Sequence, residues 1–270
     1  MGKLPQEVID EVIGSIDDTE PNGHPALLAC SRVCRSWQRQ AQKELFSFVN
    51  FTNLEQLRRW ERNISLDSEI PSYVRHLSWV AVALYNEEAP DPFLENEFPG
   101  CFASFSNLQS LLILSFSLRP LDSDAIERIF GHLGHSLHSL RFNTLTTDLE
   151  KLCLLVSLLP NLRYLYLPTV HMSEDAPRPS QENPLSFNFT GTLAPYNPGL
   201  ERLFRCVAGL RPRFGSINIG GIDHPSVEAL NLVLKNCSTT VTAISITPVF
   251  LGTEGNLMSV CWALYLANCL

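Results

Sequence analysis

The sequence has few charged residues and no long apolar run. Only 18% of its 270 residues are charged, against about a quarter in typical globular domains. No stretch approaches the ~18 apolar residues of a membrane-spanning helix. The first ten residues carry acids early and no apolar core, so they do not resemble a secretory signal peptide. We therefore expect a cytoplasmic or nuclear protein that makes no membrane contact.

A basic excess is also missing. The chain has 20 Lys and Arg residues against 28 Asp and Glu residues, which gives a net charge of −8. Nucleic-acid-binding domains normally show clustered positive charge, so we predict no nucleic-acid partner. Hydrophobic residues make up 45% of the chain, enough for one large domain or for a small domain followed by a larger one.

Motifs that would indicate an enzyme are absent from the sequence. It contains no G-x-S-x-G elbow, P-loop or dinucleotide-binding glycine fingerprint. Cys30 and Cys34 lie one helical turn apart without a further Cys or His pair at zinc spacing. His132, His135 and His138 straddle a predicted helix end and the next strand, so we do not expect them to converge. We predict a protein that is not an enzyme, with no cofactor and no metal.

A short helical pattern opens the chain. Leu4-Pro5 begins a first helix, because proline suits the first helical turn, and apolar residues then recur at helical spacing up to Ile16. The segment 17–25 contains Asp, Pro, Asn and Gly and breaks that helix. A second apolar helix carries Leu27 and leads into Val33-Cys34-Arg35-Ser36-Trp37.

A Leu-Pro helix start followed by an apolar helix that ends in Val-Cys-Arg-x-Trp resembles the F-box. Proteins of that family use the module to bind the Skp adaptor of a cullin-type ubiquitin ligase assembly. The resemblance implies a protein that brings a target to the ligase and has no active site of its own. By the same resemblance, eight residues are predicted to bind the adaptor, and some of them also build the core of the module. They are Leu4, Pro5, Val8, Ile9, Leu27, Leu28, Val33 and Trp37.

The rest of the chain repeats a six-residue pattern, apolar-x-x-apolar-x-apolar. The central apolar residues lie 25 to 34 residues apart, except for one gap of 52, and most of these spacings fit the upper range of leucine-rich repeats. Helix-start signals and an apolar helical stretch follow several copies. The central residues are Leu77, Leu111, Leu140, Leu165, Ile217 and Ile244.

A strand, a turn and a helix in each unit stack into a solenoid with a parallel sheet on its concave side. This organisation resembles the leucine-rich-repeat class of F-box proteins. The fold class we predict is α/β: an N-terminal helical F-box followed by an irregular leucine-rich-repeat-like α/β solenoid with a curved parallel sheet. The predicted boundaries are 1–52 for the F-box domain, 53–72 for a helical linker and 73–270 for the solenoid, with a polar, Pro-rich insert near 172–198.

The period of two in strands decides which residues face away from the helices. Large outward side chains that carry hydrogen-bond donors are well suited to recognition. The outward residues that we predict to bind a target protein, whose identity the sequence does not give, are Ser78, Arg141, Tyr164, Tyr166, Asn218 and Ser245.

Two functions are open at this point. In the first, the chain is the substrate-recognition subunit of a Skp–cullin–F-box ubiquitin ligase. In the second, it is a non-catalytic interaction scaffold with a degenerate F-box that does not recruit a ligase. The loop 17–25, which is longer than the usual turn at this place in the family, favours the second.

Overall fold

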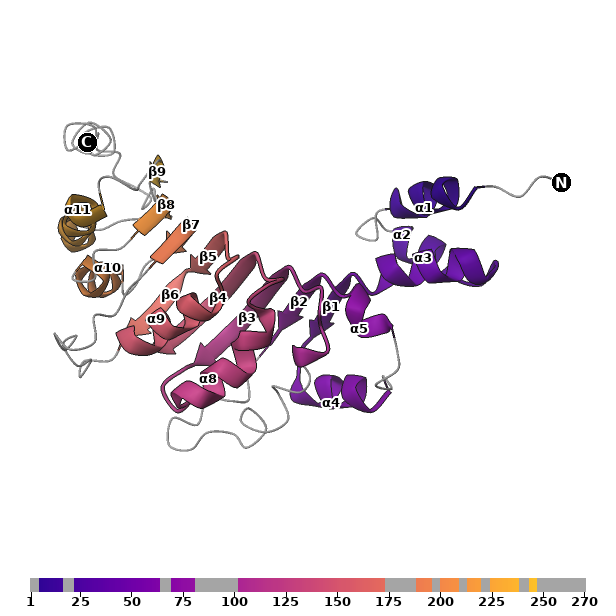
Figure 1. The fold of residues 1–270 in the computed structure, drawn as a ribbon, viewed down its shortest axis with the longest axis horizontal. Helices are drawn as coiled ribbons and strands as arrows, with labels where there is room; N and C mark the ends of the chain where they lie inside the picture. The colour runs from indigo at the N-terminus through magenta and orange to yellow at the C-terminus, as the bar shows by residue number, and fades with distance from the viewer. Residues whose placement is uncertain are drawn as a thin grey trace, which may run out of the picture.

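The computed structural model describes residues 5–16, 22–63, 69–80, 102–172, 188–195, 200–208, 213–219, 224–237 and 243–246. Helices come first, and strands then alternate with helices along most of the chain (Figure 1). The elements are α1 (Gln6–Gly14), α2 (Gly23–Cys30), α3 (Arg35–Leu45), β1 (Phe48–Phe51), α4 (Leu54–Asn63), α5 (Ile70–Tyr73), β2 (His76–Trp79), β3 (Ser110–Ser117), α8 (Ser123–Phe130), η1 (Gly131–Leu133), β4 (Ser139–Thr147), α9 (Leu149–Leu158), β5 (Tyr164–Leu167), β6 (Thr169–Met172), β7 (Asn188–Pro195), α10 (Leu200–Ala208), β8 (Arg213–Ile219), α11 (His224–Cys237) and β9 (Ala243–Ile246).

The N-terminal module consists of α1, α2 and α3, and it lies beyond the first strand at one end of the sheet (Figure 1). Helices α1 and α2 both pack against α3. Helix α1 begins directly after Pro5, whose fixed φ suits a helix start. The buried core of the module is small, and it is formed by Ile9, Ile13, Leu27 and Ala41.

Nine strands form one sheet within the described residues, and every neighbouring pair is parallel. The order is β1-β2-β3-β4-β5-β7-β8-β9, with β6 paired to β4 beside that path. Parallel neighbours need a crossover connection, and here the crossovers include α8, α9, α10 and α11, which lie on one side of the sheet (Figure 1). The prediction of an α/β fold with a parallel sheet is confirmed.

The central residues of the predicted repeat are direct neighbours across the sheet. Leu111 lies opposite Leu77 on one side and Leu140 on the other, and Leu140 lies opposite Leu165. Ile217 lies opposite Ile244 in the same way. A shift of one residue in the pairing of a strand would turn its apolar side chains to the other face of the sheet. The sequence pattern therefore specifies this register.

The region predicted as an insert near 172–198 contains a strand of the sheet, because residues 188–195 form β7. Its Leu193 lies opposite Leu165 on one side and Ile217 on the other, which fills the gap of 52 residues in the repeat. The six-residue pattern missed this strand because Thr190 and Pro195 stand where it requires apolar residues. A register shift between Phe189 and Thr192 adds to the irregularity.

The sheet also begins earlier than the predicted start at residue 73. Strand β1 pairs with β2, and its Val49 lies opposite Leu77. Leu57 of α4 is fully buried in the same core as Val49 and Phe51. The segment predicted as a helical linker therefore contributes α4 to the first unit of the sheet.

The main core lies between the sheet and its helices and extends from α4 to α11. Aromatic rings are concentrated around β3. The ring of Phe116 lies 6.2 Å from Trp79, 6.1 Å from Phe130 and 6.0 Å from Phe142, measured between centroids. All four side chains are 2% exposed or less. This cluster ties three strands and α8 together.

Aspartate caps begin two of the helices that cover the sheet. A carboxylate oxygen of Asp122 accepts a hydrogen bond from the N–H of Ala125 at 2.7 Å, at the start of α8. Asp148 caps α9 in the same way through the N–H of Lys151 at 2.9 Å. Such caps satisfy one of the free N–H groups of the first turn.

Replacing Asp122 with alanine is expected to lower the free energy of unfolding by about 1 kcal/mol, because the N–H of Ala125 loses its partner. Asp122→Asn keeps an acceptor oxygen and should be close to wild type. The exposed Asp124 in the first turn gives the matched control, and Asp124→Ala should cost only a few tenths of a kcal/mol. Urea denaturation of the three variants checks this, and equal losses at Asp122→Ala and Asp124→Ala would contradict the capping role.

Candidate interaction surfaces

The N-terminal module leaves large apolar side chains in contact with solvent. Seven such side chains are exposed among the described residues, and four of them belong to this module. Val8 and Val12 of α1 are 41% and 52% exposed, Leu28 of α2 is 40% exposed, and Val33 is 61% exposed. Apolar groups concentrated in this way on a small module mark a surface for another macromolecule.

The structure separates the predicted adaptor residues into exposed and buried sets. Pro5, Val8, Leu28 and Val33 are exposed, so they are available for a contact. Their role in adaptor binding stays a prediction. Leu4 lies outside the described residues.

Three other predicted adaptor residues belong to the core of the module instead. Ile9 is 8% exposed, Leu27 is fully buried, and Trp37 packs partly buried against them. In α1, Ile9 and Ile13 lie one turn apart on the side that faces α3, while Val8 and Val12 share a neighbouring side. Ile9 and Leu27 are therefore corrected from contact residues to core residues.

The Val33-Cys34-Arg35-Ser36-Trp37 segment forms the turn from α2 into α3. Cys34 is extended at the start of α3, and its carbonyl accepts the N–H of Gln38 at 2.8 Å. The pKa of the Cys34 thiol is lowered, first because the backbone N–H of Trp37 favours the thiolate and second because the Ser36 hydroxyl does so. The turn leaves Val33 exposed while Trp37 reaches the core.

A charged network connects the module to the sheet domain. The guanidinium of Arg39 on α3 lies 3.1 Å from a carboxylate oxygen of Glu69, and the hydroxyl of Tyr73 on α5 donates to the same oxygen at 2.7 Å. The hydrogen bond from Tyr73 and then the charge of Arg39 lower the pKa of Glu69. Burial, followed by the hydrogen bond to Glu69, raises the pKa of Tyr73.

Replacing Glu69 with glutamine is expected to weaken this connection at neutral pH by a small amount, since the ion pair is exposed. Because the folded state lowers the pKa of Glu69, its contribution is fully present above the ordinary value of 4.5 and is lost as pH falls through the folded value. The urea midpoints of wild type and Glu69→Gln should therefore converge below pH 4.5. Glu61→Gln, on the exposed surface of α4, is the control, and a midpoint difference for Glu69→Gln that does not depend on pH would contradict the role of the carboxylate.

The outward face of the sheet carries two of the predicted target residues on adjacent strands. Arg141 of β4 lies opposite Tyr166 of β5, and its guanidinium carbon is 4.9 Å from the centroid of the tyrosine ring. This is a cation–π contact, which holds both side chains in place. Arg141 is exposed, Tyr166 is half-buried, and the nearby Tyr164 is 56% exposed. The structure thus brings these three predicted target residues together.

Other predicted target residues do not join this group in the described structure. Ser78 is 8% exposed and is buried, so it is corrected to an inaccessible position. Asn218 and Ser245 lie opposite each other on β8 and β9, and their side chains lie outside what the structure describes.

One exposed residue of this face was missed by the sequence pattern. Phe48 of β1 is 53% exposed and lies opposite His76. From His76 the same register row continues to Ser110, Ser139 and Tyr164, so this row has an aromatic residue on β1 and another on β5. Strand alternation around the buried Val49 and Phe51 was the signal that could have found it.

The described residues show neither a metal site nor a membrane-spanning helix. Within the described ranges, no three His, Cys, Asp or Glu side chains come together in a way that could hold a metal ion. Among the helices that the structure describes, none combines the length and apolar character needed to cross a bilayer.

A small helical module with an exposed apolar surface is thus joined to an α/β domain built on a parallel sheet. Residues 1–48 match the family model of the F-box domain, which ends at the first residue of β1. The chain therefore carries an F-box domain at residues 1–48, and the prediction made from the Leu-Pro start and the Val-Cys-Arg-x-Trp segment is confirmed. No curated protein matches the chain. The F-box domain indicates an adaptor that binds Skp in a ubiquitin ligase.

Proposed function

We propose that this protein is the substrate-recognition subunit of a Skp–cullin–F-box ubiquitin ligase. The observation that carries the proposal is the F-box match at residues 1–48 together with the exposed apolar side chains Val8, Leu28 and Val33 on the same module. An adaptor that covers these side chains gains the free energy of their removal from water, about 1.5–3 kcal/mol for each fully buried aliphatic residue. The protein contributes binding and no catalytic group, and it acts in the cytoplasm or the nucleus.

We infer that the sheet domain is an irregular leucine-rich-repeat-like solenoid. The support is the repeat itself: one apolar residue from each of eight strands stands in a single row across the sheet, from Val49 to Ile244. Units that contact only their neighbours build such rows, with helices on one side.

In this proposal the target protein binds the outward face of the sheet. Arg141, Tyr164 and Tyr166 support it, because large side chains with donors are enriched among the residues that dominate protein interfaces. Asn218 and Ser245 extend the same surface in the proposal, as their backbone positions are paired on β8 and β9.

The test is co-expression of the unmutated full chain with the Skp adaptor and the cullin subunit, followed by affinity capture and size-exclusion chromatography. The receptor function predicts a stable complex that also retains the cullin subunit. The alternative, an interaction scaffold with a degenerate F-box, predicts that the chain is soluble and folded but recovers no adaptor. Recovery of the adaptor without the cullin would also contradict the receptor function.

A further inference from the structure

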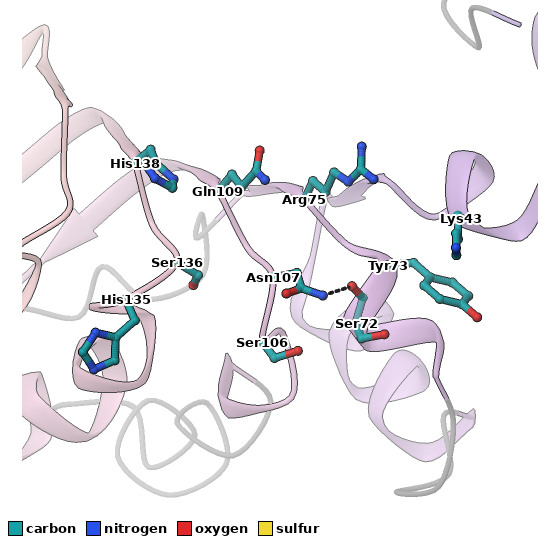
Figure 2. A pocket seen from close by; sticks show the side chains of 10 residues that line it. All are labelled: Lys43, Ser72, Tyr73, Arg75, Ser106, Asn107, Gln109, His135, Ser136 and His138. Atoms are coloured by element: carbon teal, nitrogen blue, oxygen red, sulfur yellow. Dashed lines mark hydrogen bonds between the residues drawn. The ribbon is translucent and has the colours of Figure 1, made fainter. Parts of the chain in front are cut away.

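A polar groove lies where the N-terminal module meets the sheet, along the edge at which β2, β3 and β4 begin (Figure 2). It has a volume of about 680 Å³. Lys43 at the end of α3, Arg75 before β2 and His138 before β4 contribute to its wall. All ten residues that line it are polar, and none of these described residues is Asp or Glu. This composition stands out in a chain with a net charge of −8.

The backbone holds the wall of this groove in a regular row. The carbonyl of Arg75 accepts the N–H groups of Gln109 and Ser110 at 2.8 and 3.0 Å. The carbonyl of Gln109 accepts those of His138 and Ser139 at 2.8 and 2.9 Å. Arg75, Gln109 and His138 therefore stand side by side just before successive strands, as Figure 2 shows, at the roughly 4.8 Å spacing of a sheet. The carbonyls are occupied, so side chains do the recognition.

Two further polar groups shape the groove. Asn107 donates to the carbonyl of Ser72 at 2.8 Å, which ties α5 to the loop before β3 and fixes the floor (Figure 2). The hydroxyl of Ser136 is buried and has no hydrogen-bond partner within the part of the chain that the structure describes. Ammonium, guanidinium, amide and hydroxyl groups thus line the groove, and no Asp or Glu lines it. The carboxylate of Glu69, which accepts the Tyr73 hydroxyl, lies close enough to Lys43 for the charge of Lys43 to help lower the pKa of Glu69, so Arg75 is the cation that we place at the centre of recognition.

We propose that this groove binds an acidic segment of the target polypeptide. Oxyanions of Asp, Glu or phosphorylated side chains pair with Lys43 and with the guanidinium of Arg75, whose fork matches a carboxylate or phosphate. A groove that crosses three strands spans roughly 10–15 Å, which is the length of about three to five residues of extended peptide. The inference rests on the proposed function, since it assumes that the ligand is a protein delivered for ubiquitin transfer.

The test measures fluorescence anisotropy of labelled ten-residue peptides with the full chain at low salt and without any ligase component. One peptide alternates Glu and Ser, a second alternates Gln and phosphoserine, and a third alternates Gln and Ser. We expect both acidic peptides to bind at least about tenfold more tightly than the neutral one. The acidic peptide with the higher affinity shows whether the groove prefers carboxylates or phosphates.

The variant Arg75→Glu with Gln109→Glu reverses the charge of the groove at two exposed side chains, so the fold is kept. It should weaken both acidic peptides by about tenfold or more, and Lys43→Gln should weaken them by a smaller factor. The matched control, Arg128→Glu with Lys235→Glu, changes two exposed cations on α8 and α11 and should bind within about twofold of wild type.

Three results would overturn the proposal: a neutral peptide that binds as tightly as the acidic ones, a groove variant that binds them like wild type, or a single-stranded RNA hexamer that binds while neither acidic peptide does. Capture of the Skp adaptor by the same variants separates this outcome from failure of the proposed function. If the chain still captures the adaptor but binds no peptide, only the peptide-binding role of the groove is rejected. If the unmutated chain does not capture the adaptor, the proposed receptor function is rejected.

Discussion

Replacing Leu28 and Val33 together with glutamate is expected to abolish binding of the Skp adaptor. The two side chains are 40% and 61% exposed in the free protein, so an adaptor can cover both. The double variant removes two apolar contacts and places two carboxylates in a desolvated interface, where an unpaired charge costs several kcal/mol. We expect the dissociation constant to rise by more than about 100-fold, which biolayer interferometry with purified adaptor measures.

The matched control is Leu232→Glu on α11. Leu232 is 42% exposed, close to the value of Leu28, but it lies at the far end of the chain from the F-box domain. It should bind the adaptor like wild type. All variants should keep the wild-type free energy of unfolding within about 0.5 kcal/mol, because exposed changes away from caps and cores have small effects. An unchanged dissociation constant in the double variant would show that the adaptor uses another surface.

Truncating Phe116 to alanine should give the largest loss of stability of any single change considered for this protein. Its ring is 2% exposed and contacts the rings of Trp79, Phe130 and Phe142. Phe-to-Ala changes in cores cost about 3–5 kcal/mol through lost transfer free energy and the cavity left behind. The expected result is a fall of that size in the free energy of unfolding, measured by urea denaturation with fluorescence and circular dichroism.

Tyr164→Ala on the outward face is the control for aromatic truncation. Tyr164 is 56% exposed, and its loss should cost less than about 1 kcal/mol. Phe116→Leu should fall between the two, because a leucine fills most of the space. A small effect for Phe116→Ala would mean that β3 and α8 do not share one continuous core.

The sequence predicted much of the sheet because parallel repeats leave a simple signal. One apolar residue per strand must face the helices at the same level, so the spacing of Leu77, Leu111, Leu140 and Leu165 was enough to predict their pairing. Strand β7 broke the pattern with Thr190 and Pro195, and backbone pairing with both neighbours outweighed the weak local signal.

The candidate surfaces were harder to predict, for reasons of packing. Val8 and Ile9 are adjacent apolar residues of one helix, and only the position of α3 decides which of them is buried. Strand alternation gives the direction of the Ser78 side chain but not what covers it. The polar groove leaves no signal in the six-residue pattern, because its residues lie outside that pattern and come from several separate segments.

The passage from the F-box domain to the sheet is very short. Helix α3 ends at Leu45 and β1 starts at Phe48, and the carbonyl of Ser47 between them accepts the N–H groups of Arg75 and His76 at 2.8 and 2.9 Å. For the proposed receptor, this means that no flexible linker lets the bound target protein, its cargo, change orientation relative to the ligase. Only lysines of the cargo that happen to face the ubiquitin-charged enzyme come within its reach, so the choice of modified lysine is a matter of geometry more than of local sequence.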